Sequence, residues 1–79
     1  MPIMTIRAIN ATFESTSSGE FETVDDAYRA GLTASLRIAA DEVAQSIPSS
    51  IVEFLIVNDG QGQVARGAVA VSTARMLNV

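Results

Sequence analysis

"IVEFLIV", residues 51–57, decides the fold of this chain, because it is a strand-like run of β-branched and aromatic residues with one charge, Glu53. Successive side chains of a strand point to opposite faces of a sheet, so the run predicts two apolar faces. The two sets are Ile51, Leu55 and Val57, and Val52, Phe54 and Ile56. One helix covers one face of a sheet, so we expect another chain to cover the second face.

The segment "NDGQGQ", residues 58–63, has the polar composition of a ligand loop. A calcium loop needs several acidic oxygen ligands, yet Asp59 stands alone and no acid follows it. A phosphate-binding loop needs a lysine, and the chain has none. Asp59 and Gly60 instead suit the positive φ angles of a tight turn. We predict a hairpin over Ile56 to Val64 with no bound ion, and a fourth strand over Val64 to Val71.

A long helix is expected before residue 51. Thr23 and Asp26 have the spacing of a capping box, which places the start of the helix here. Apolar residues recur at spacings of three and four from Val24 to Ile47, and Pro48 predicts that the helix ends near residues 45–46. The residues expected to face the sheet include Leu32, Leu36, Ala39 and Val43.

The N-terminal third predicts a hairpin. Apolar and polar residues alternate from Ile3 to Ala8, which indicates a half-buried strand. The polar segment Ser15 to Gly19 predicts a turn, and Glu20 to Val24 a short second strand. The predicted fold class is therefore α+β: a single domain of residues 1–79 in the order ββαββ, with an antiparallel-rich four-stranded sheet and one long helix packed on one face.

Composition excludes several function classes. The 79 residues include no cysteine, histidine or lysine, and five arginines against nine acids give a net charge of −4. Nucleic-acid binding requires a cationic surface, which this chain lacks. A serine nucleophile lacks its usual base, and Schiff-base chemistry lacks its lysine. No apolar run approaches the roughly 18 residues that span a bilayer, so we expect a cytoplasmic protein without membrane contact or cofactor.

Two groups of charged residues were candidates for chemistry. Neighbouring acids at 25–26 and 41–42 point about 100° apart on a helix, so neither pair converges on one substrate atom. Arg7, Arg66 and Arg75 form an anion pocket across an oligomer interface in one interpretation, and are separately solvated in the other.

The start "MPI", followed by a strand and later by a helix and strand, resembles the tautomerase superfamily of small oligomeric enzymes. In that superfamily, removal of the first methionine exposes a proline amine that acts as general base. The resemblance implies Pro2 as the catalytic residue.

A second resemblance covers nearly the whole chain. "DDAYRAGLTASLRIAADEVA" (25–44) and "EFLIVNDGQGQVARGAVAVSTARML" (53–77) look like a family of small bacterial proteins of unknown function. Proteins of that family open with a Met-Pro strand and an acidic glycine turn, followed by an Ala/Arg/Leu-rich helix and a hairpin that turns on Asp-x-x-Gly. This resemblance implies the fold and brings no activity.

The sequence thus favours a structural or protein-interaction module without catalytic activity, assembled as a homodimer or a larger even-numbered oligomer. Two alternatives are a tautomerase-like enzyme that uses Pro2, and a regulatory module that binds a protein partner by sheet-edge addition. The expected interface residues are Ile51, Val52, Phe54, Ile56, Val69 and Val71.

Overall fold

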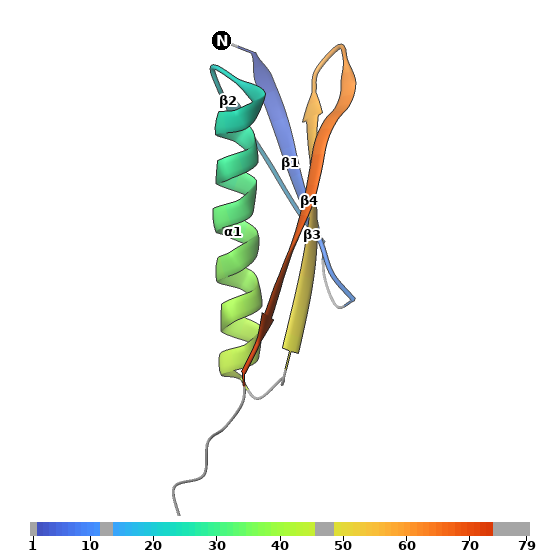
Figure 1. The fold of residues 1–79 in the computed structure, drawn as a ribbon. Coiled ribbons are helices and arrows are strands. Elements are labelled where there is room, and N and C mark those ends of the chain that lie inside the picture. Colours follow the sequence, from blue (N-terminus) through green and yellow to red (C-terminus); the bar gives the residue numbers. More distant parts are fainter. Residues whose placement is uncertain (1, 12–13, 46–48, 74–79) are drawn as a thin grey trace, which may run out of the picture.

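The computed structural model describes residues 2–11, 14–45 and 49–73, which form one four-stranded sheet and one helix (Figure 1). The elements are β1 (Ile3–Ile9), β2 (Glu14–Glu20), α1 (Val24–Ala44), β3 (Ser49–Asn58) and β4 (Gly62–Ser72). The strand order is β2-β1-β3-β4, and every neighbouring pair is antiparallel. The predicted α+β fold in the order ββαββ is confirmed.

The two central strands follow the predicted alternation. In β1, Met4, Ile6 and Ala8 are buried, and in β3 every second residue from Ser50 to Ile56 is buried. Ile6 lies opposite Ile56 across the β1–β3 pair, so both strands present their apolar set to the same face. That face is the one that α1 covers (Figure 1).

The hairpin between β3 and β4 is confirmed. Asn58 pairs with Gly62, and the Gln61 amide donates to the Asn58 carbonyl at 3.0 Å, which closes a four-residue turn. Gly60 has φ +92°, as the third residue of a type II turn requires, and Gly62 has φ +81°. A bulge between Ile56 and Val57 shifts the register beside this turn.

The second strand was predicted in the wrong place. β2 is Glu14–Glu20, so the serine-rich segment expected to be a turn is itself the strand. Of the segment predicted as that strand, Glu20 is the last residue of β2, residues 21–23 form the connection, and Val24 begins α1. α1 packs on β1, β3 and β4 within the described chain, so β2 lies beyond the helix and keeps its polar side chains exposed. Pairing with β1, and not an apolar pattern, makes this segment a strand.

The ends of α1 agree with the sequence. Thr23 caps the helix, with its hydroxyl accepting a hydrogen bond from the Asp26 amide at 3.0 Å. The last helical residue is Ala44, and Gln45 is the C-cap.

The face of α1 that packs on the sheet differs from the prediction. Leu32 and Leu36 are 37% and 50% exposed, and the buried stripe consists of four small residues: Ala27, Gly31, Ser35 and Ala39. Of the other two predicted core residues, Ala39 is buried as expected, and Val43 is partly buried. Small side chains allow the helix backbone to approach the sheet closely, which leaves space only for side chains that rise from the strands.

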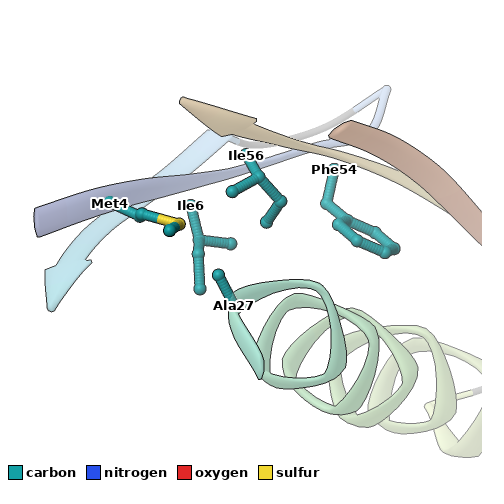
Figure 2. Close-up of a cluster of buried hydrophobic side chains, with 5 residues drawn as sticks. All are labelled: Met4, Ile6, Ala27, Phe54 and Ile56. Carbon is teal, nitrogen blue, oxygen red and sulfur yellow. The ribbon is translucent and has the colours of Figure 1, made fainter. Parts of the chain in front are cut away.

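The largest of these strand side chains is Phe54, which is fully buried with Met4, Ile6, Ala27 and Ile56 in the main core cluster (Figure 2). A second cluster, near the other end of the helix, contains Ala8, Ala39, Val52 and Val69. The core is therefore a single layer between α1 and one face of the sheet.

Candidate functional site

Among residues 2–11, 14–45 and 49–73, nothing packs on the face of the sheet opposite α1; we call it the open face. It consists of Ile3, Thr5, Arg7 and Ile9 in β1, Ile51, Glu53, Leu55 and Val57 in β3, Arg66, Ala68 and Ala70 in β4, and the polar alternate residues of β2. Ile51 is 63% exposed and Ile3 47% exposed. Ile9, Leu55 and Val57 lie between them and are partly buried. The open face is thus an apolar band across the two central strands.

Only part of the predicted interface lies on this face. Ile51 belongs to the open face, whereas Val52, Phe54, Ile56 and Val69 are buried beneath α1, and Val71 packs against the same covered cluster. These five side chains point away from the open face because they occupy the opposite parity of their strands. In one chain, therefore, Ile51 is accessible, and the other five predicted interface residues belong to the interior or border of the monomer.

Arg7 and Arg66 do not share a pocket within the described part of one chain. Arg7 forms an ion pair with Glu14 on the neighbouring strand, with Arg7 Nη2 2.6 Å from Glu14 Oε1. Arg66 lies in the same cross-strand row, separated from Arg7 by Leu55 and hence by two strand spacings, or about 10 Å. Arg75 lies outside the described residues. Within one chain Arg7 and Arg66 are therefore separate, and Arg7 is neutralised by Glu14.

The two edges of the sheet differ in composition. β2 carries Glu14 and Glu20 at its ends with serine and threonine between them. β4 is eleven residues long, contains no proline, and has Arg66 as its one charged residue. Charged side chains and proline are the usual protection of a free edge against pairing with another strand. β4 therefore offers a long, poorly protected row of backbone donors and acceptors.

A polar cluster joins α1 to the sheet near the C-terminal end of the helix. Asn10 Nδ2 donates to Glu42 Oε1 at 2.8 Å, and the Ser50 hydroxyl donates to the same oxygen. Asn10 directly follows β1, Glu42 belongs to α1 and Ser50 to β3. These hydrogen bonds hold the helix against the sheet. The cluster combines one carboxylate, one amide and one hydroxyl, and this combination does not form a nucleophile–base pair.

Ser35 is a second unusual polar group. Its side chain is fully buried between α1 and the sheet, and its hydroxyl has no hydrogen-bond partner among the residues that the structure describes. The single small hydroxyl fits the closely packed stripe of α1 and faces apolar strand residues.

Pro2 is exposed at the start of β1, and its carbonyl accepts a hydrogen bond from the Phe21 amide at 3.1 Å. This contact involves the carbonyl oxygen of Pro2 and not its nitrogen, which is the atom on which tautomerase chemistry depends. Within residues 2–11, 14–45 and 49–73, no three acidic side chains lie close enough together to hold a metal ion. The helix in that part of the chain is not apolar enough to cross a membrane.

The sequence reasoning missed two features of the surface. The exposed pair Leu32 and Leu36 was assigned to the core, although Ala27, Gly31, Ser35 and Ala39 recur at intervals of four and mark a close-packing stripe. The free edge of β4 could not be predicted, because the order of strands in the sheet does not follow from the residue pattern of each strand.

Comparison with known proteins adds no relative: no family model, no curated protein and no solved structure matches this chain.

Proposed function

We propose that this protein is a homo-oligomeric structural or protein-interaction module of the cytoplasm, without catalytic activity, whose working surface is the open face of the sheet. The observation that carries the proposal is the exposure of Ile51 and Ile3 beside the partly buried Leu55 and Val57 on a face with no helix over it. Full burial of such a side chain contributes about 1.5 to 3 kcal/mol of stabilisation relative to exposure. A protein surface that covers this face therefore binds with a favourable contribution from each buried side chain.

Symmetry makes a second copy the most economical cover. Two-fold dimers are the commonest soluble assemblies, and a two-fold axis places an apolar band against its own equivalent. The charges on the open face are few: Arg7 is paired with Glu14, and the others are Glu20, Glu53 and Arg66. Glu53 and Arg66 are opposite charges able to meet across such an axis.

Light scattering coupled to size exclusion tests the proposal. At micromolar concentration we expect at least twice the 8.3 kDa mass of one chain. Ile51→Lys should shift the protein toward the monomer, since it places a charge at the most exposed apolar position of the band. Ala34→Lys is the matched control, because Ala34 is exposed on the helix and lies away from the open face.

Both substitutions make the negative net charge smaller and so weaken general repulsion between copies. A selective effect of Ile51→Lys therefore reports on the band itself. A wild-type chain that stays monomeric at this concentration would contradict the proposal.

A further inference from the structure

We propose that the free edge of β4 takes a second copy of this chain, by antiparallel pairing of β4 with the partner's β4 across a two-fold axis, while the adjoining flanks of the two helices cover each other. This inference deepens the proposed self-association and rests on it. It names a contact distinct from the open face.

The edge itself provides the first observation. β4 pairs only with β3 within the described residues, so the backbone groups on its outer side have no strand partner. Its sequence, "GQVARGAVAVS", is small and apolar apart from Gln63 and Arg66. The opposite edge, β2, has charged side chains at both ends, Glu20 and the Arg7-paired Glu14, and charged side chains protect an edge from strand addition. Of the two edges, β4 is the one suited to strand addition.

The helix provides an independent observation on the same side of the molecule. A Cβ placed on Gly67 of β4 would lie 3.0 Å from the Tyr28 hydroxyl, so Tyr28 marks the flank of α1 that borders β4. Leu32 and Leu36 follow Tyr28 at intervals of four residues and continue along this flank. We call Tyr28, Leu32 and Leu36 the β4-side flank. In Figure 1 β4 lies in front of β3, with α1 beside it, and β2 lies behind.

Exposure along the β4-side flank agrees with helix geometry. A step of four residues turns about 40° around the helix, so each member points farther from the sheet than the one before. Tyr28 is partly buried, Leu32 is 37% exposed and Leu36 50% exposed. The flank therefore ends in two apolar side chains that project beside an unpaired strand.

A second copy of the chain covers both the unpaired edge of β4 and the exposed leucines of the β4-side flank. For this reason we identify the partner as a second copy. An isolated strand from another protein would satisfy the edge and leave Leu36 in water. A second copy brings its own helix to the same level above the extended sheet, so that each β4-side flank meets its equivalent.

The distribution of charge also favours a second copy of the chain as the partner at the β4 edge. The chain carries a net charge of −4, which repels a second copy in general. On this side, however, the charged residues of the strand and the adjoining helix turn are Arg66 and the internally neutralised pair Asp25 and Arg29, 3.5 Å apart. Two copies can therefore approach through β4 without bringing their excess acids together.

Amide hydrogen exchange of the intact protein tests the geometry. In an antiparallel edge strand, the amides that point outward have no partner and exchange readily, whereas those that point to the neighbouring strand are protected. We expect the outward amides of β4 to exchange at least about tenfold more slowly than those of β2, which serves as the internal control.

Light scattering on variants supplies the second arm. Leu36→Lys should raise the dissociation constant of the β4-edge dimer at least about tenfold, because Leu36 loses its apolar contact. Ala34→Lys is the control: it adds the same charge to an exposed position about 200° from Leu36 around the helix.

The outcomes separate this inference from the proposed function. An oligomer that loses mass on Ile51→Lys but keeps freely exchanging outward β4 amides would overturn the edge contact and leave the open-face module standing. A chain that is monomeric and exchanges equally at both edges would overturn both, and would leave the β4 edge open to a strand of another protein.

Discussion

At the scale of single residues, Phe54 is the side chain around which the core is built. Its ring lies between the helix and β4, where glycines face it from both sides: a Cβ on Gly31 or on Gly67 would lie 2.8 Å from a ring atom. The ring of Tyr28 packs against the ring of Phe54, with the two ring centroids 5.2 Å apart and the two ring planes tilted by 54°. This geometry explains why glycines occupy the middle of a helix and of a strand, where they are otherwise unfavourable.

Gly67→Ala should lower the free energy of unfolding by about 1 to 3 kcal/mol, because the added methyl group overlaps the Phe54 ring in a packed interior. Gly19→Ala is the matched control in another strand, since its Cβ would meet Phe21 at an ordinary 3.4 Å. Its effect should remain within about 0.5 kcal/mol. Chemical denaturation measures both, and equal losses in the two variants would contradict the role of Phe54.

Ser35→Ala should raise the free energy of unfolding by about 1 kcal/mol, because it removes a buried hydroxyl without a hydrogen-bond partner and keeps the small side chain that close packing requires. Ser50→Ala is the contrasting change. It deletes a hydroxyl that donates to Glu42, so it should cost about 1 to 3 kcal/mol. A loss of stability in Ser35→Ala would show that its hydroxyl is hydrogen-bonded after all.

At the scale of secondary-structure elements, local chemistry decides where α1 begins. Thr23→Ala should lower the free energy of unfolding by about 0.5 to 2 kcal/mol, because the Asp26 amide loses its acceptor. Thr33→Ala, at an exposed position inside the helix, should be neutral or slightly stabilising, since alanine is the better helix former. Thermal or chemical unfolding compares the two variants. Equal effects would mean that the cap contributes nothing.

The β3–β4 hairpin depends on a left-handed residue at its turn. Gly60 has φ +92° and open space around the position of a Cβ, so a side chain there meets backbone strain and no clash. Gly60→Val should therefore cost about 1 to 2 kcal/mol. Gly60→Asn should cost less, because asparagine tolerates positive φ. If denaturation shows asparagine to be as costly as valine, sterics and not backbone conformation govern this turn.

Elements with a strong local signal were predictable, and β2 was not. Thr23 and Pro48 bound the helix in the sequence, and Asp59 with Gly60 marks the hairpin. β2 has neither alternating apolar residues nor turn residues at its ends. It is a strand because β1 offers it a paired edge, and backbone pairing does not require an apolar pattern in the strand that is added.

At the scale of the whole molecule, assembly should appear in the thermal stability. The chain has one apolar layer under α1, and the open face and the β4 edge remain for other contacts. We therefore expect the melting temperature to rise by several degrees when the protein concentration increases about a hundredfold, because the folded state binds its own copy and the unfolded state does not.

Circular dichroism over that concentration range measures the effect. The Ile51→Lys variant should show a weaker dependence than the Ala34→Lys control. A wild-type melting temperature that is independent of concentration would contradict self-association at either surface.

The element order, the bounds of the helix, the turn at Gly60 and the two apolar sets of β3 could be predicted from the sequence, because capping, positive φ and alternation are local properties of neighbouring residues. Which set of β3 is covered, and which face of α1 covers it, depends on tertiary packing. Both Leu36 and Ala39 fit the same helical pattern, and the close approach between helix and sheet selects the smaller side chain.

Strand order was likewise decided by the tertiary structure. The patterns of β2 and β4 do not say which strands lie at the edges, yet the edge position of β4 beside Leu32 and Leu36 defines a surface for a second copy. That position depends on how β1 pairs with β3, residues about fifty apart in the chain. Such long-range pairing is a property of the folded molecule as a whole, because it is selected by the total burial of apolar surface and not by any one segment.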